Sequence, residues 1–134
     1  MKGIELAARR AALGMTQTDL ARVLGVQQEA ISRWETGLRS PRDPGDVQEA
    51  IERLEGIQDA LIDELCEVGE HSSSVLDSPT VVFRVFASDE DYWSADRRAE
   101  RERIPAALHR SSAVWAARIL AEEWDICARL SLAP

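Results

Sequence analysis

Two short helical patterns joined by a glycine turn are the feature that most constrains this chain. Thr16 can cap a helix over residues 17–24 by accepting a hydrogen bond from a first-turn amide. Gly25 then permits a tight turn into a second helix over about residues 28–36, which ends at Gly37. Both helices carry an apolar face. The first third of the chain is therefore predicted to be a bundle of short helices.

Two helices of about two turns each, joined by a short turn that contains glycine, have the helix-turn-helix layout. A further helical pattern over residues 3–13 precedes them and ends at Gly14. This region resembles a known family in its sequence motifs, which are Arg10, Leu13-Gly14-Met15-Thr16-Gln17, Leu20-Ala21, Leu24-Gly25-Val26, Ile31-Ser32-Arg33-Trp34-Glu35, Gly37 and Pro41. The family is the phage-repressor helix-turn-helix family of Cro-type and Xre-type regulators, and the resemblance covers about residues 4–42. It implies that residues 1–45 are a DNA-binding domain.

The second helix of such a domain enters the major groove with its N-terminal residues toward the base edges. The residues expected to contact bases are Gln27, Gln28, Glu29, Ser32 and Arg33. Gln28 offers the paired donor and acceptor that suit adenine, Arg33 has the fork that suits guanine, and Glu29 can accept from cytosine N4. Gln27 departs from the family, which usually has Ser or Thr before this helix, and Gln is a poorer N-cap.

Contacts to the DNA backbone are expected at three other residues. Gln17 matches the family position whose side chain and amide meet a phosphate, and a helix N-terminus favours an anion there. Arg39 and Arg42, in the loop after the second helix, are expected to contact phosphates as well. The resemblance gives Arg10 and Glu35 a structural role instead, as an internal ion pair between helices.

The overall charge first argues against a nucleic-acid partner. The chain has 134 residues and a net charge of -8, which alone would repel DNA. The charge is unevenly distributed, however: +2 over residues 1–45, -8 over residues 46–70 and -2 over residues 71–134. The acidity therefore belongs to the middle of the chain, and the first segment can still present a positive surface.

The acidic segment 46–70 has apolar residues at spacings of three and four, which predicts one long amphipathic helix. Asp43, Pro44 and Asp46 are typical of the start of such a helix. Its apolar stripe suits either a coiled-coil seam or packing in a core. Serines and Pro79 then predict a linker over residues 71–79.

Residues 80–134 are expected to be a small α+β dimerisation region. Residues 80–86 form the one convincing strand pattern, and a long helix is expected from about residue 104 to about residue 130. A single strand cannot satisfy its own backbone groups. Unless a partner strand lies hidden in the chain, we expect pairing with the same strand of a second subunit. The residues assigned to that interface are Val81, Phe83, Val85, Trp93 and Trp115.

The fold class is thus mainly α, with an N-terminal helix-turn-helix bundle, a long helix and a strand–helix region. In layout alone this order also resembles small anti-CRISPR-associated autorepressors. His71 and His109 have no Cys or Ser partner at a recognisable spacing, so no catalytic residues are expected. No metal or cofactor is expected either. No apolar run is long enough to cross a membrane and no secretory signal is visible, so the expected location is the cytoplasm.

The sequence therefore predicts a DNA-binding transcription regulator that is not an enzyme. The most specific form of this hypothesis is a homodimeric repressor, such as an autorepressor, that binds an inverted repeat in double-stranded DNA. The alternative is an antitoxin or protein-interaction module, in which residues 80–134 bind a partner protein while the first domain regulates the operon.

Overall fold

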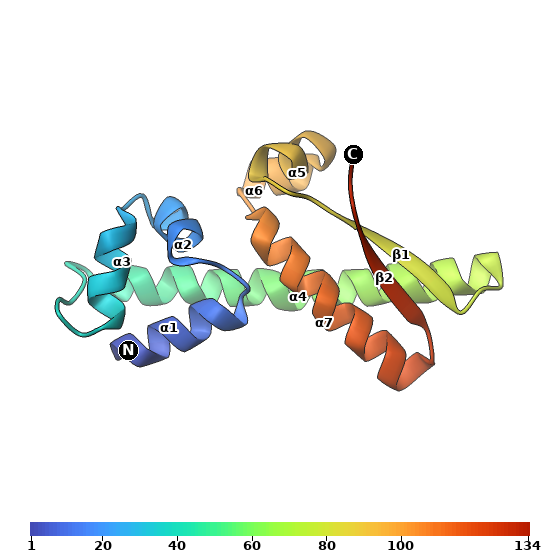
Figure 1. Cartoon of the computed structure of the whole chain (residues 1–134), viewed down its shortest axis with the longest axis horizontal. Coiled ribbons are helices and arrows are strands. Elements are labelled where there is room, and N and C mark those ends of the chain that lie inside the picture. Colours follow the sequence, from blue (N-terminus) through green and yellow to red (C-terminus); the bar gives the residue numbers. More distant parts are fainter. The chain divides into compact units, whose positions relative to one another are not determined.

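The computed structural model describes residues 1–134, which divide into unit 1, residues 1–56, and unit 2, residues 57–134. Figure 1 shows the order of helices and strands along the chain. The long helix α4 contributes its first turns to unit 1 and the remainder to unit 2. The structure is mainly helical and has a two-stranded sheet, and none of its helices combines the length and the apolar composition needed to cross a lipid bilayer.

Unit 1 contains the predicted succession of short helices, which are α1 (Gly3–Ala12), α2 (Gln17–Leu24), α3 (Gln28–Glu35) and the start of α4 (Pro44–Leu76). The predicted cap of α2 is confirmed: the Thr16 hydroxyl accepts from the Asp19 amide at 3.0 Å, and the Asp19 carboxylate accepts from the Thr16 amide at 2.9 Å. Gly25 has a φ of 68°, which glycine adopts without a steric penalty. The turn between α2 and α3 therefore depends on glycine.

The first turns of α4 complete the core of unit 1. Val47, Ile51 and Leu54 are buried, and their spacing places them on one face of the helix. Beside this face of α4, one turn after Ile51, Glu55 accepts hydrogen bonds from Arg9 of α1 at 2.5 and 3.0 Å. The other buried apolar residues of this unit are Leu6, Leu13, Met15, Leu20, Ala21 and Ile31. The helical bundle thus extends beyond residue 45, where the sequence placed the domain boundary.

Unit 2 contains two strands, so the expectation of a single strand is wrong. Strand β1 (Thr80–Val85) pairs in parallel with β2 (Cys127–Leu132). Parallel neighbours need a long connection, and here it consists of α5 (Asp89–Ala95), α6 (Arg97–Glu102) and α7 (Ala106–Trp124). The last helix therefore ends well before residue 130.

A sharp change of backbone conformation separates α7 from β2. Asp125 follows the helix with a φ of 52°, a left-handed conformation that Asp tolerates better than most residues. Beyond it, Ala128, Leu130 and Leu132 alternate with polar residues, and this period of two is typical of a strand. The hidden partner strand therefore has a sequence signal, although a short one.

The three strand residues assigned to a subunit interface lie inside unit 2. Val81, Phe83 and Val85 are buried in a cluster with Ala113, Ala116, Leu120 and Ile126. Gly69 of α4 lies so close to this cluster that a Cβ atom there would be 2.6 Å from Leu120 Cδ1. Because β2 supplies their backbone partners and α7 covers their side chains, these residues are not available to a second subunit, which corrects that assignment.

The two tryptophans assigned to the same interface differ in their contacts and in their exposure to solvent. Trp93 donates from its indole Nε1 to the Ile104 carbonyl at 2.7 Å, and the Arg103 guanidinium lies 4.8 Å from its ring centre. Trp93 is therefore engaged within unit 2. Trp115 is exposed, with Arg118 stacked over its ring.

The predicted linker is helical over most of its length. Residues 71–76 are the last turns of α4, and Asp77 ends the helix with a φ of 49°. The Ser78 amide then donates to the Ser73 carbonyl at 3.0 Å. Each serine costs only a few tenths of a kcal/mol in helix propensity, so the preceding turns of α4 carry the helix through this polar segment.

An aromatic cluster in unit 2 generates a prediction for pH dependence. The rings of Tyr92 and His109 have centroids 4.6 Å apart, and Phe86 packs beside both. Burial lowers the pKa of His109 below its ordinary value of 6.5; among the charges nearby, Asp96 opposes this effect and Arg110 adds to it. His109 Nδ1 is buried with no hydrogen-bond partner. The folded state therefore favours the neutral imidazole.

Below pH 6.5 the unfolded chain binds a proton that the folded chain excludes, so unit 2 should lose stability as the pH falls. The expected slope approaches about 1 kcal/mol per pH unit. Urea unfolding at pH 7.5 and 5.5 measures it, with His109→Phe as the control that lacks the titrating group. Equal losses in the two proteins would contradict this account.

Candidate nucleic-acid interface

The residues expected to contact bases extend from the N-cap of α3 to its last turn. Gln27, Glu29 and Arg33 are exposed, and Gln28 and Ser32 are half-buried. Gln27 makes no capping hydrogen bond with its side chain, in agreement with its low N-cap preference. The first amides of α3 are therefore not capped by this residue.

A chain of side-chain hydrogen bonds connects α3 to α2 and α1. Gln28 Nε2 donates to Gln17 Oε1 at 2.6 Å, and Gln17 Nε2 donates to Glu35 Oε1 at 2.9 Å. Glu35 also accepts from Arg10 Nε at 2.6 Å and from Arg10 Nη2 at 2.9 Å. The remaining Arg10 terminal nitrogen donates to the Met15 carbonyl at 2.8 Å. Gln28 is thus fixed through Gln17 to a bidentate ion pair.

The ion pair is shielded from water. The Arg10 and Glu35 side chains are only 16% and 6% exposed. Burial by itself would raise the pKa of the Glu35 carboxyl, but hydrogen bonds from Arg10 and Gln17 outweigh it and hold the pKa below its usual value. The hydrogen bonds that Arg10 donates to Glu35 in turn raise the pKa of Arg10. Both groups are therefore charged at neutral pH and act as a rigid link between α1 and α3.

The hydrogen bond between the two glutamines leaves part of Gln28 free. A glutamine amide has two N–H donors and one carbonyl acceptor, and Gln17 occupies only one donor of Gln28. The free donor and acceptor are the two groups needed to bind adenine N7 and N6 together. Gln28 is therefore oriented without losing its capacity to bind a base.

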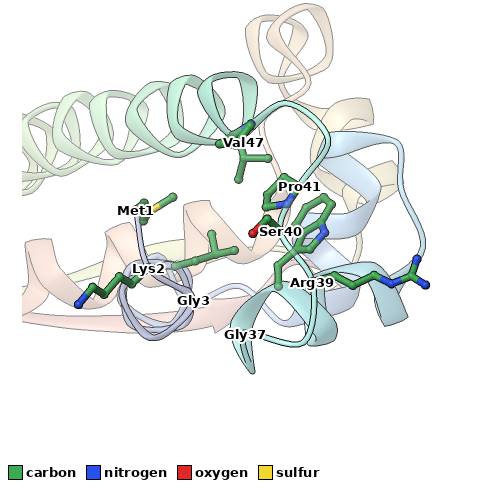
Figure 2. A pocket seen from close by; sticks show the side chains of 11 residues that line it. Met1, Lys2, Gly3, Gly37, Arg39, Ser40, Pro41 and Val47 are labelled. Atoms are coloured by element: carbon green, nitrogen blue, oxygen red, sulfur yellow. The ribbon is translucent and has the colours of Figure 1, made fainter.

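The loop after α3 positions Arg39 at the surface. The Arg39 amide donates to the Arg33 carbonyl at 3.2 Å, which ties the loop to the end of α3. The loop borders a hollow of about 310 Å³. Figure 2 shows the Arg39 side chain pointing away from this hollow. The hollow is lined by Met1, Lys2, Gly3, Leu6, Trp34, Gly37, Arg39, Ser40, Pro41, Pro44 and Val47. Arg39 is thus directed to solvent.

Five of the arginines of unit 1 fall into two groups. Arg9 and Arg10 are held by Glu55 and Glu35. Arg33, Arg39 and Arg42 are exposed, and no carboxylate lies within ion-pair distance of them. The second group consists of the arginines that the sequence assigned to DNA, and their positive charge is not neutralised within the chain.

A comparison with protein families agrees with this geometry. Residues 6–44 match the model of a family described as helix-turn-helix. No curated protein matches the chain. The match confirms the resemblance to phage-repressor regulators seen in the motifs, so the first domain of the protein is a helix-turn-helix domain of this type.

This domain makes the protein a DNA-binding transcription regulator. The matched residues include Gln17, the whole of α3, and both loop arginines, Arg39 and Arg42. Sequence reasoning missed two features of the site. They are the hydrogen bond between Gln17 and Gln28 and the ion pair between Arg9 and Glu55, neither of which follows from spacing along the chain.

The buried ion pair yields a stability prediction. Arg10→Met should lower the free energy of unfolding of unit 1 by about 3 kcal/mol, because it leaves the Glu35 carboxylate buried without its partner. The double variant Arg10→Met/Glu35→Leu should recover most of this loss, since no unpaired charge remains. Urea unfolding measures both. A double variant as unstable as the single one would show that the charge imbalance is not the cause.

Proposed function

We propose that the protein is a sequence-specific repressor that binds an inverted repeat as a homodimer, with α3 in the major groove. The observation that carries the proposal is the hydrogen-bonded chain from Arg10 to Gln28, which fixes a base-reading side chain and leaves its donor and acceptor free. Such orientation before binding reduces the entropy lost on complex formation.

Base reading is assigned to Gln28 in the first turn of α3 and to Arg33 in its last turn, with Gln27, Glu29 and Ser32 as further candidates. Gln28 suits adenine, Arg33 suits guanine, and Glu29 suits cytosine. Gln17 is at N1 of α2. The Thr16 cap takes up the amide of Asp19 at N3, so the amides of the first two helical residues and the helix dipole favour a phosphate there. Arg39 and Arg42 supply further phosphate contacts, which position the domain without reading sequence.

Two linked domains would bind DNA more tightly than one. Binding of the first domain raises the effective concentration of the second at the neighbouring half-site. Half-sites for paired helix-turn-helix domains are about 34 Å apart, one turn of the double helix. A palindromic operator recovered by selection from random DNA, with this spacing, would test the symmetry and the specificity together. Recovery of unrelated sequences would contradict the proposal.

The base contacts predict a contrast among three alanine variants. Gln28→Ala and Arg33→Ala should each cost about 1–3 kcal/mol on the selected operator and relax the preference at one base pair. Arg42→Ala should weaken binding to all sequences alike and reduce the salt dependence by the share of one phosphate contact. Titrations of the operator and its single-base variants at several salt concentrations measure these effects.

Arg42→Ala serves as the matched control for Arg33→Ala, since it also removes an exposed arginine side chain but lies outside α3. If Arg33→Ala bound every operator variant as the unchanged protein does, the proposed docking of α3 would be wrong.

A further inference from the structure

Strand β2 has one edge without a backbone partner. Its amides at Cys127 and, just beyond the strand, at Ala133 donate to the Pro79 and Val85 carbonyls, on the side of β1. Backbone groups of successive residues in a strand point alternately to opposite edges. The N–H and C=O groups of Ala128, Leu130 and Leu132 therefore point to the other edge, where the two-stranded sheet has no further strand.

The same three residues leave apolar surface uncovered. In the parallel register they lie beside Val81, Phe83 and Val85, so their side chains are on the face of the sheet that carries the core. Leu130 and Leu132 are nevertheless 37% and 61% exposed. Helix α7, which packs against β2, also exposes Val114 and Trp124. The core face of the sheet thus continues to the free edge without being covered there.

The free edge of β1 differs from that of β2 in the hydrogen bonds and the side chains that it carries. The Ser78 hydroxyl accepts from the Thr80 amide at 3.2 Å and donates to the Thr80 carbonyl at 3.3 Å, so backbone groups at the start of β1 are already occupied. The edge-directed residues of β1 also have their side chains on the outer face, and these include the charged Arg84. Monomeric proteins use such devices to protect an edge strand. In β2 the charged residue, Arg129, has its backbone groups on the side of β1, and the edge-directed residues Ala128, Leu130 and Leu132 are all uncharged.

We propose that β2 pairs antiparallel with β2 of a second copy of this chain, with the two-fold axis at Leu130, to form a four-stranded sheet across the dimer. Leu130 then exchanges hydrogen bonds with its symmetry mate, and Ala128 does so with the partner's Leu132. In this register every backbone N–H and C=O group that points to the free edge has a hydrogen-bond partner. A two-fold interface requires a surface that is complementary to itself, and this edge meets that requirement.

The charges of β2 agree with the same register. Arg129 and Ser131 lie on the outer face of the sheet, and pairing about Leu130 places Arg129 opposite Ser131 of the partner. Pairing about Arg129 would instead bring two arginines face to face, which is destabilising. The register about Leu130 therefore uses the free backbone groups and avoids repulsion between like charges.

This inference rests on the proposed homodimer and assigns its interface to a surface that the sequence did not indicate. The experiment combines sedimentation of the full chain with hydrogen exchange. The protein should sediment as a dimer, and the amides of Ala128, Leu130 and Leu132 should exchange more slowly as its concentration rises. A monomer at all concentrations, or fast exchange of these amides in a dimer, would overturn the proposal.

Substitutions on the two faces of the sheet provide a matched pair. Leu132→Lys should raise the dimer Kd about 100-fold, since each of the two copies loses the burial of one leucine, worth about tenfold or more. Val82→Lys should leave the Kd unchanged, because Val82 is 59% exposed, much like Leu132, but lies on the outer face. Circular dichroism confirms that both variants are folded. Equal effects of the two changes would contradict the assignment.

A cross-link tests the register directly. With Cys66 and Cys127 replaced by Ser, Leu130→Cys should form a disulfide between subunits, because directly paired residues across antiparallel strands have Cα atoms about 5.5 Å apart. Val82→Cys should not cross-link. A dimer with no cross-link at residue 130 would show that the interface lies elsewhere, without contradicting the proposed function. Failure to select any operator would instead reject the proposed function, without contradicting the dimer interface.

Discussion

The buried ion pair between Arg10 and Glu35 is the interaction on which the DNA-binding site depends. A charged pair in a poorly hydrated position is stable only when nearly all its hydrogen bonds are made, and here Gln17 and the Met15 carbonyl take up the remaining groups. The pair therefore fixes the distance between α1 and α3. Gln28 is held by Gln17, which is held by Glu35, so the orientation of Gln28 depends on a pair of charges that is largely buried.

The two units expose different kinds of chemical groups to solvent. Unit 1 leaves arginines unpaired on and near α3, where they can release counterions from a phosphate backbone. Unit 2 instead leaves leucines and backbone groups uncovered at the edge of its sheet. The acidic residues concentrated along α4 lie between these two kinds of surface in the sequence. A negative net charge of the whole chain is therefore compatible with a DNA-binding domain whose free side chains are basic.

The sequence predicted unit 1 well because its signals are local. The cap at Thr16, the turn at Gly25 and the start of α4 at Pro44 each depend on neighbouring residues, and all are present in the structure. Strand β2 was missed because Ile126 and Leu130 continue the helical spacing of α7, and a left-handed Asp125 ends that helix without a glycine. The candidate residues of the DNA site come from motifs and stay predictions, whereas the contact between Gln17 and Gln28 depends on how closely α2 and α3 pack.

The parallel pairing of β1 with β2 also determines the order in which the chain can fold. The contacts among α1, α2 and α3 join residues at shorter separations, 11 positions for Gln17–Gln28 and 25 for Arg10–Glu35. The paired residues of the sheet in unit 2 are 47 positions apart and are connected through three helices. Pairing of strands so distant along the chain is slow compared with the packing of neighbouring helices. Synthesis proceeds from the N-terminus, so the DNA-binding helices can be folded while β1 still lacks its partner. Unit 2 can complete its sheet only after β2 has been synthesised.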